Sequence, residues 1–397
     1  MVLPQLRFKG FTAEWSKKRL DTFLERVSKP VDVVDDQEYV QIGIRSHGKG
    51  IFHKKPVTGK ELGNKRVFWI VPNALVVNIV FAWERAIAVT SQNENGLIAS
   101  HRFPMYLPKN NLSNVDFLRY MFITDKGQSY LELASPGGAG RNKTLGQTNF
   151  AELKIDLPEI EEQTQIASFL SAVDEKISEL TKKHELLSQY KQGMMQKLFS
   201  QQIRFKADDG SEFREWDKKQ LSRILTESLI KGSKGDKAKK LTVKLWGKGV
   251  VAKNEVFQGS ENTQYYKRSK GQLIYGKLDF LNGAFGIIPD YLDGYESTID
   301  APAFDVDQEQ CNSLFLFYRL LQKDFYKKNG DEADGSRKAK RINQKVFLAM
   351  SIDLPSLSEQ TKIANFLSTI DQKIDKVSQQ IEETKQWKKG LLQQMFV

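Results

Sequence analysis

A stretch of about 45 residues occurs twice in this chain, and this duplication constrains the fold more than any other feature. The copies align without a gap at an offset of 197 residues, from Ile155 to Phe199 and from Ile352 to Phe396 (352 − 155 = 197). Both contain Asp-Leu-Pro near the start, then Glu-Gln-Thr, and a final Phe. Self-similarity at a long fixed period indicates repeated structural units. The sequence therefore predicts two halves that each end in the same element.

Apolar residues recur about every 3.5 positions along both copies, which is the pattern of a coiled coil. Each copy spans about five heptads, so we expect a helix of roughly 60 Å at 1.5 Å per residue. The predicted seam residues are Ile166, Leu170, Val173, Ile177, Leu180 and Leu187 in the first copy, and Ile363, Leu367, Ile370, Ile374, Val377 and Ile381 in the second. An apolar seam requires a partner, and the nearest one is the other copy.

Some positions depart from the apolar pattern. The polar seam residues, which can fix register and pairing at some cost in stability, are His184, Lys191, Thr384 and Lys388. Gly193 and Gly390 lie in the helix interior, where a glycine costs about 1 kcal/mol relative to alanine. We interpret both as points of close backbone approach, with fraying near the helix end as the alternative. Pro158 and Pro355 stand where a helix can begin, because a first-turn proline loses no hydrogen bond.

The residues between the repeats predict two mainly β units. Each unit has short runs of β-branched and aromatic residues bounded by turn residues, then one apolar helix, at 114–121 and 312–320. The predicted class is α+β. The predicted division is a first β-rich domain at 1–153, a helical repeat at 154–201, a second β-rich domain at 202–350 and a second helical repeat at 351–397.

The chain is basic, with a formal charge of +11 and a pI near 9.3. This balance is typical of a protein that meets a polyanion, and the excess is clustered in loops. The candidate DNA contacts are Lys49, Arg141, Asn142 and Lys143 in the first half, and Lys234, Lys237, Lys239, Lys240, Lys248, Arg337, Lys338, Lys340, Arg341 and Asn343 in the second. The alternative for any one of them is a solvated loop residue. Two different basic units on one spacer predict an asymmetric target in double-stranded DNA.

Several chemistries find no support in the sequence. The single cysteine, Cys311, excludes a disulfide framework and fits a reducing cytoplasm. His47 and His53 lack a Glu at a metalloprotease spacing, so we predict no metal site. Phosphate-cradling and nucleophile-elbow motifs are absent, and no apolar run approaches the length that spans a bilayer. We therefore expect a soluble, cytoplasmic binding protein that carries no catalytic residues.

Taken together, these residues resemble the specificity subunit of type I restriction-modification enzymes. The resemblance covers the whole chain and rests on Leu-Pro followed by Glu-Gln-Thr in both repeats, with the Lys-x-Gly tails at 191–199 and 388–396. It implies two target-recognition domains, with the two helices paired antiparallel as the spacer between them. It also implies docking of two methyltransferase subunits on this chain, and restriction subunits in the full complex. S-adenosylmethionine, ATP and Mg²⁺ are then expected in those partner subunits, with no cofactor in this chain.

Two other classes of function remain open from the residues alone. A self-contained nuclease or methyltransferase with unfamiliar motifs would modify DNA without partners. A coiled-coil adaptor would hold proteins and show no salt-dependent binding to a duplex.

Overall fold

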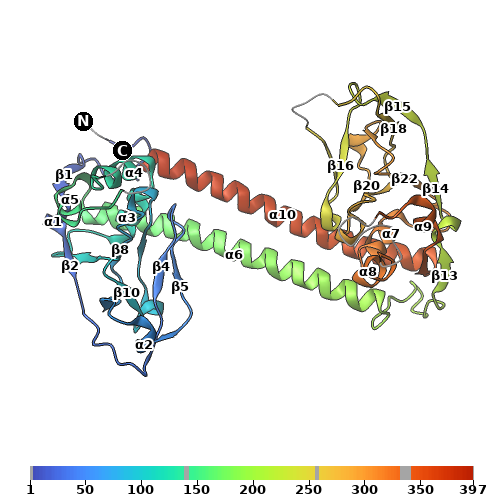
Figure 1. Ribbon diagram of the computed structural model, residues 1–397. Coiled ribbons are helices and arrows are strands. Elements are labelled where there is room, and N and C mark those ends of the chain that lie inside the picture. The colour runs from blue at the N-terminus through green and yellow to red at the C-terminus, as the bar shows by residue number, and fades with distance from the viewer. Residues whose placement is uncertain (1–2, 138–142, 255–258, 331–340, 397) are drawn as a thin grey trace. The chain divides into compact units, whose positions relative to one another are not determined.

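The computed structural model describes residues 3–137, 143–254, 259–330 and 341–396 (Figure 1). It divides into two compact units. Unit 1 combines Met1–Thr181 with Gln379–Val397, and unit 2 is Lys182–Ser378. Each unit therefore contains one β-rich domain with the start of one long helix and the end of the other.

A four-stranded antiparallel sheet forms the centre of unit 1, in the order β2-β11-β8-β9. Its strands are β2 (Leu24–Val27), β8 (Leu75–Val77), β9 (Ile87–Val89) and β11 (Met105–Pro108). Strand β8 consists of three fully buried aliphatic residues, as the apolar run at 74–82 predicts, although the strand is shorter than that run. A fully apolar strand is expected where both faces of a sheet are covered.

Unit 2 repeats this sheet strand for strand, in the order β14-β22-β19-β20. Its strands are β14 (Leu225–Ser228), β19 (Leu273–Tyr275), β20 (Phe285–Ile287) and β22 (Ala303–Val306). The predicted runs at 272–275 and 284–288 are confirmed as β19 and β20. The duplication thus extends from the long helices to the domains between them.

Other strands of each domain form small antiparallel sheets beside the central sheet. In unit 1 they are β3 (Glu38–Tyr39), β4 (Ile42–Ile44), β5 (Ile51–His53), β6 (Val57–Thr58), β7 (Val67–Trp69) and β10 (Ile98–Ser100). In unit 2 they are β15 (Lys231–Lys234), β16 (Leu241–Val243), β17 (Val250–Ala252), β18 (Gln264–Lys267) and β21 (Glu296–Ser297). Strands β4 and β5 form a hairpin, as do β16 and β17.

The predicted apolar helix of each half is confirmed as α3 (Val115–Phe122) and α7 (Ser313–Leu320). Asn114 and Asn312 cap these helices, and each side-chain oxygen accepts two backbone N–H bonds of the first turn. The other short helices are α1 (Leu20–Phe23), α2 (Gly59–Leu62), α4 (Asp125–Leu133), α5 (Gln147–Glu152), α8 (Lys323–Gly330) and α9 (Gln344–Ala349).

A short strand precedes each long helix. β12 (Lys154–Leu157) pairs antiparallel with β1 (Ser16–Arg19), and β23 (Ser351–Leu354) pairs with β13 (Asp217–Gln220). The helix itself begins two residues after the proline in both repeats, as α6 (Ile160–Phe199) and α10 (Leu357–Met395). The first residues of each repeat are therefore strand, because they find hydrogen-bond partners near the start of their own half.

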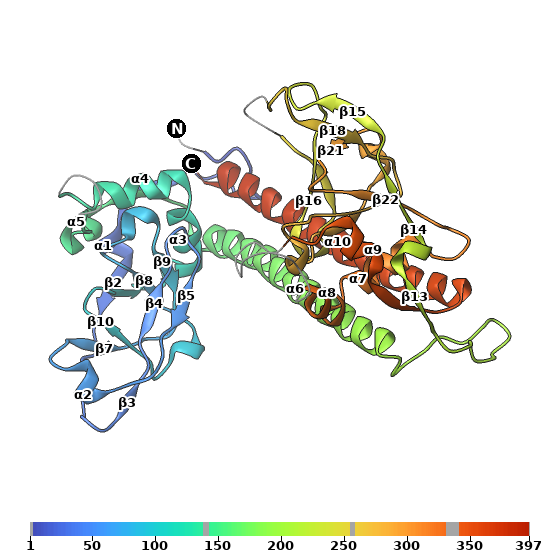
Figure 2. The same cartoon turned by 45° about the vertical axis from the view of Figure 1, so that its right-hand side comes forward.

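Helices α6 and α10 each run without interruption (Figures 1 and 2). In unit 1 the start of α6 shares one core with the end of α10, and in unit 2 the start of α10 shares one core with the end of α6, so the two helices are antiparallel. Nine of the twelve seam residues are buried, while Ile177, Leu187 and Ile374 are partly exposed.

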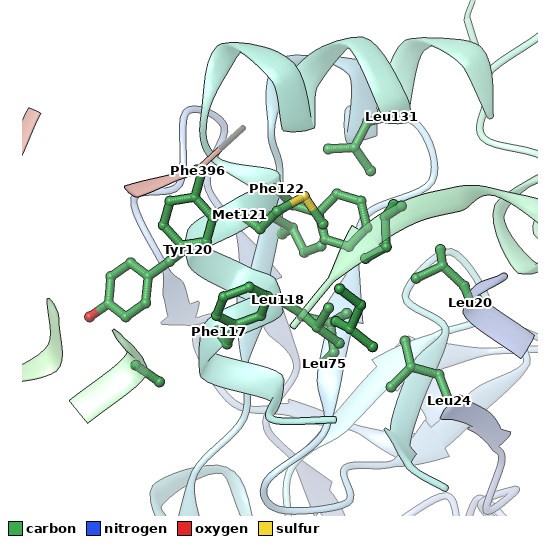
Figure 3. Packing of buried hydrophobic residues seen from close by; sticks show 14 of the residues in the cluster. Leu20, Leu24, Leu75, Phe117, Leu118, Tyr120, Met121, Phe122, Leu131 and Phe396 are labelled. Carbon is green, nitrogen blue, oxygen red and sulfur yellow. The ribbon is translucent and has the colours of Figure 1, made fainter. Parts of the chain in front are cut away.

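The core of unit 1 joins helix α3, the central sheet and both long helices. Figure 3 shows Phe117, Leu118, Met121 and Leu75 in one cluster, with Phe396 from the end of α10 on the same side as Phe117. The ring centroids of Phe117 and Phe396 are 5.2 Å apart. In unit 2 the end of α6 takes the same place, with Phe199 5.6 Å from Phe315. The end of each long helix is therefore part of the core of the domain it reaches.

The two helix-interior glycines do not behave as the sequence suggests. Both lie inside regular helix, which continues to Phe199 and Met395, so fraying is the wrong interpretation. Close backbone approach is also wrong, because a Cβ at Gly193 or Gly390 would meet no described atom within 4 Å. Gly193 instead borders an open groove of about 880 Å³ in unit 2, beside Trp246.

Candidate nucleic-acid interface and its anchoring to the helices

The candidate contacts of unit 1 lie in two loops. Lys49 is exposed in the turn of the β4–β5 hairpin. Lys143 is partly exposed, with its ammonium 6.0 Å from the ring centroid of Trp83. Arg141 and Asn142 lie outside the described residues. The structure therefore places two of the four predicted residues of this unit at the surface.

In unit 2 the lysines concentrate on two small sheets, β15-β18-β21 and β16-β17. Lys234 ends β15, and Lys237 and Lys239 follow it in the next loop, all three exposed. Lys248 is exposed in the turn of the β16–β17 hairpin. Exposed ammonium groups on these two sheets and their turns can neutralise phosphates of a duplex.

Lys240 has a different environment from its neighbours. Its side chain is buried, and its ammonium lies 5.5 Å from the ring centroid of Tyr265. The sequence groups Lys240 with the exposed lysines, but the backbone turns this residue inward at the start of β16. Its side chain is engaged within unit 2.

The second basic loop of unit 2 falls largely outside the described residues, namely at Arg337, Lys338 and Lys340. Arg341 is exposed, with its Nη1 3.8 Å from Asp300 Oδ1. Asn343 is exposed and caps α9, because its Oδ1 accepts the backbone N–H of Val346 at 3.0 Å. The amide oxygen of Asn343 therefore already has a structural role.

Close packing fixes the two hairpin turns that carry Lys49 and Lys248. Gly48 and Gly247 precede these lysines, with φ of 65° and 66°. A Cβ at Gly48 would lie 2.7 Å from Ile123, and one at Gly247 would lie 2.4 Å from Leu321. Glycine meets both demands, since it adopts positive φ freely and leaves room for the neighbour. Each turn is thereby held against the end of α3 or α7.

A buried arginine supports the lysine-bearing sheet of unit 2. The Arg268 guanidinium donates to Ser228 O and to Ser297 Oγ, both at 2.8 Å. Arg268 is 1% exposed, and burial lowers its pKa to about 10. These bonds connect the end of β14 in the central sheet with β21 in the small sheet. They hold the small sheet β15-β18-β21, which carries Lys234, in a defined position.

The Glu of each Glu-Gln-Thr motif anchors the chain segment that opens its half. The Arg7 guanidinium donates to Glu162, with Nε to Oε1 at 2.6 Å and Nη2 to Oε2 at 2.7 Å. Arg204 donates to Glu359 in the same way, at 3.0 and 2.8 Å. The hydrogen bond to Glu162 raises the pKa of Arg7, so the guanidinium keeps its charge at neutral pH.

The Gln of the motif ties the long helix to the start of α3 or α7. Gln163 accepts the backbone N–H of Asn114 at 2.9 Å and donates to the carbonyl oxygens of Pro158 and Leu112. Gln360 makes the equivalent bonds to Asn312, Pro355 and Gln310. Both glutamines are fully buried. The repeated motif is therefore an anchor that fixes each domain to its helix.

The structure offers little for catalysis in the part it describes. No group of three or more His, Cys, Asp and Glu side chains among the described residues could hold a metal ion. Cys311 is fully buried, and burial raises the pKa of its thiol to about 12, so it is a poor nucleophile at neutral pH. No described helix is long and apolar enough to cross a membrane.

Sequence reasoning does not identify the residues that connect each domain to the helices. Arg7, Glu162 and Gln163 belong to phrases that recur at the 197-residue offset, and this recurrence is the signal that could have found them. Tyr120 and Asp174 are connected by a 2.7 Å hydrogen bond, and both have counterparts in the second half. Arg268 leaves no such signal.

Comparison with known proteins places this arrangement in context. The family model for the type I restriction modification DNA specificity domain matches residues 60–188 and 302–386. The type I restriction enzyme MjaVIII specificity subunit of Methanocaldococcus jannaschii is 25% identical over 411 residues, covering 94% of this chain and 90% of that protein. The putative MjaX specificity subunit of the same organism is 27% identical over 304 residues, covering 70% of this chain and 67% of that protein.

A solved structure shares the fold. The crystal structure of a type I restriction-modification S subunit from M. genitalium covers 100% of this chain and 99% of its own, with a TM-score of 0.62 and 16% identity.

Proposed function

The chain belongs to the type I restriction modification DNA specificity family, and on that premise we propose that it is the DNA sequence-specificity subunit of a type I restriction-modification complex. In this role it binds the target and carries no catalytic group. The observation that supports this most directly is the duplication of the anchored domain. Two units have the same sheet order and the same Arg–Glu and Gln anchors, yet different exposed basic residues.

Each β-rich unit recognises one half of a bipartite target. Lys49 and Lys143 in unit 1, and Lys234, Lys237, Lys239 and Lys248 in unit 2, contact phosphates and position the duplex. Side chains of the neighbouring loops then contact base edges, where Arg and Lys favour guanine and Asn and Gln favour adenine. Because the two units present different residues, the two half-sites differ and the target is asymmetric.

Helices α6 and α10 determine the distance between the half-sites. Both are continuous, and each begins in one unit and ends in the other. A helix is a stiff spacer of 1.5 Å per residue. Deleting one heptad from each helix removes about 10 Å and should alter the permitted spacer or abolish activity.

Two methyltransferase subunits dock on this chain, and restriction subunits join them in the full complex. S-adenosylmethionine is bound by the methyltransferase subunits, and ATP and Mg²⁺ serve the restriction subunits. This chain supplies target binding and the positions of those partners. The complex works in the cytoplasm, where the host DNA is accessible.

An exchange of recognition domains tests the proposal. Residues 1–153 are replaced by the corresponding segment of another family member, and the complex with its methyltransferase subunits is assayed for adenine methylation. We expect one half of the methylated motif to change while the other half and the spacer stay the same. The reciprocal exchange of residues 202–350 is the matched control and should change the other half only.

Other outcomes favour the two remaining classes of function. Methylation or cleavage by the purified chain alone would identify a self-contained enzyme. A chain that binds proteins but shows no salt-dependent affinity for any duplex would be an adaptor.

A further inference from the structure

One carboxylate in unit 1 connects three elements that are far apart in the sequence. Asp174 lies on α6. Its Oδ2 accepts a hydrogen bond of 2.7 Å from the hydroxyl of Tyr120, which lies on α3 of the recognition domain. Its Oδ1 accepts a hydrogen bond from the ammonium of Lys388, which lies on α10. The Lys388 ammonium also lies 5.3 Å from the ring centroid of Tyr120. The recognition domain and both long helices therefore meet at this carboxylate.

Unit 2 contains the same arrangement with the helices exchanged. Asp371 on α10 accepts the hydroxyl of Tyr318, on α7, at 2.7 Å and the ammonium of Lys191, on α6, at 2.5 Å. The Lys191 ammonium lies 5.1 Å from the ring centroid of Tyr318. Helices α3 and α7 share few residues, but this tyrosine is present in both.

These contacts are partly shielded from water. The side-chain exposures are 18% for Lys388, 35% for Asp174, 21% for Lys191 and 33% for Asp371. Charge-assisted hydrogen bonds in such surroundings are stronger and more directional than bonds at an open surface. Burial also raises the pKa of Tyr120 to about 12, so its hydroxyl remains a donor at neutral pH.

The two contacts select one direction and one register of the helices. Asp174 and Lys191 lie 17 residues apart on α6 (191 − 174 = 17), and Asp371 and Lys388 lie 17 apart on α10 (388 − 371 = 17). In the antiparallel pairing each aspartate meets the lysine of the other repeat. A parallel pairing in equal register would instead place aspartate opposite aspartate and lysine opposite lysine, which is unfavourable.

The Tyr120 hydroxyl adds a directional contact to the apolar core between the recognition domain and the helices. Hydrophobic contact is roughly proportional to area and is not directional, whereas a hydrogen bond at 2.7 Å has a narrow geometry. In Figure 3 the hydroxyl of Tyr120 points out of the cluster, away from the packed side chains of α3. Its ring packs in the core, and its hydrogen-bonded hydroxyl favours one orientation of the recognition domain on the helices.

We propose that Tyr120–Asp174–Lys388 and Tyr318–Asp371–Lys191 are two orientation locks, each of which holds its recognition domain at one angle on the helix pair. The six side chains are positioning residues that act on the DNA spacing without touching DNA. This inference rests on the proposed function, because the angle of each domain matters only if both domains bind one duplex.

The test measures spacer tolerance in the reconstituted complex of this chain with its methyltransferase subunits. The substrates are duplexes that carry both half-sites, determined from the methylated motif of the host genome, with the native spacer or with one base pair added or removed. The measured quantity is the ratio of methylation rates on the native and altered spacers. The variants are Tyr120→Phe and Tyr318→Phe, which keep the ring and remove only the hydroxyl.

We expect each variant to keep methylating the native target. Its ratio of methylation rates on the native and altered spacers should fall about tenfold, which is the factor equivalent to the free energy of one charge-assisted hydrogen bond. Tyr106→Phe is the matched control, since Tyr106 is also buried in unit 1 and its hydroxyl has no hydrogen-bond partner among the described residues. Its ratio should equal that of the unmodified chain. Asp174→Asn and Asp371→Asn, which weaken both bonds of a lock, should lower the ratio at least as far.

Two results would overturn the inference, and they are distinguishable. The first is an active unmodified complex together with unchanged spacer ratios in both tyrosine variants and both asparagine variants. This result would contradict the orientation locks but not the proposed function. An unmodified complex that methylates none of the duplexes would overturn the proposed function, and the locks with it.

Discussion

Arg7 makes a bidentate ion pair with Glu162, a residue 155 positions further along the chain, and Arg204 makes the same pair with Glu359. The two glutamates are 1% and 0% exposed. Two parallel N–H···O bonds fix the mutual orientation of the groups as well as their distance. The segment that opens each half is thereby attached to the start of the long helix that ends it.

Removing one partner of this buried pair should destabilise unit 1. In Glu162→Leu the Arg7 guanidinium loses its carboxylate partner and keeps only the carbonyl oxygen of Ala13 as an acceptor, while its side chain is 14% exposed. Breaking a buried pair costs about 3 kcal/mol of unfolding free energy. Urea titration measures this value. Glu152→Leu is the control, because its contact with Arg19 at 3.5 Å is exposed and should change stability by about 0.5 kcal/mol or less. Equal effects of the two substitutions would contradict the anchor.

The end of α10 should matter as much to unit 1 as residues of that unit's own domain. Phe396→Ala removes a ring that packs on Phe117 and Trp15, and truncating a core phenylalanine costs about 3 kcal/mol or more. Differential scanning calorimetry should show a lower melting temperature for this variant. Leu186→Ala, at a residue of α6 that is 55% exposed, is the control and should melt like the unmodified chain.

Charge reversal tests the direction of helix pairing. Asp174→Lys with Asp371→Lys places each new ammonium beside Lys388 or Lys191, so like charges face each other in both units. We expect reduced helix content and lower thermal stability by circular dichroism. Adding Lys191→Asp and Lys388→Asp restores opposite charges and should recover much of the loss. A quadruple variant no more stable than the double variant would show that these contacts do not select the pairing.

The exposed lysines of unit 2 should determine how DNA affinity depends on salt. Each lysine that contacts a phosphate contributes about 0.9 to the slope of log affinity against log salt concentration. Replacing Lys234, Lys237 and Lys239 by alanine should therefore reduce the slope by up to about 3. Lys183→Ala, an exposed residue of α6, should leave it unchanged. Fluorescence anisotropy at several salt concentrations gives the slope, and an unaltered slope in the triple variant would exclude these residues.

Cys311 should be unreactive while the protein is folded. Burial raises its pKa from 9.0 to about 12, so the thiolate fraction at pH 8 falls about a thousandfold, and alkylation slows at least as much. The unfolded thiol ionises first as pH rises, so this group lowers stability between pH 9 and 12 and has no effect below that range. Rapid labelling of the native protein by iodoacetamide would contradict the buried position.

The sequence carries the features that depend on local periodicity. Heptads predict α6 and α10, and the apolar run from Asn114 predicts α3. The strands β19 and β20 follow from short runs of β-branched and aromatic residues. Each of these signals lies within the element that it predicts, and the duplication confirms it by presenting it twice.

Features that depend on residues far apart in the chain cannot be predicted from local sequence patterns. Strand β12 forms because Ser16–Arg19 lie beside it, about 140 residues earlier in the chain. Lys240 belongs to a run of lysines, yet the fold turns it inward against Tyr265. Gly193 suggests a close approach that the described structure does not contain. Burial of a single side chain is set by tertiary packing, which charge and propensity do not determine.

The most direct test of the account is a map of N6-methyladenine across the host genome with and without this gene. The account predicts that deletion removes methylation from one interrupted, asymmetric motif and from no other. An unchanged map, in cells that express this chain together with a methyltransferase subunit, would contradict the proposed role in DNA specificity.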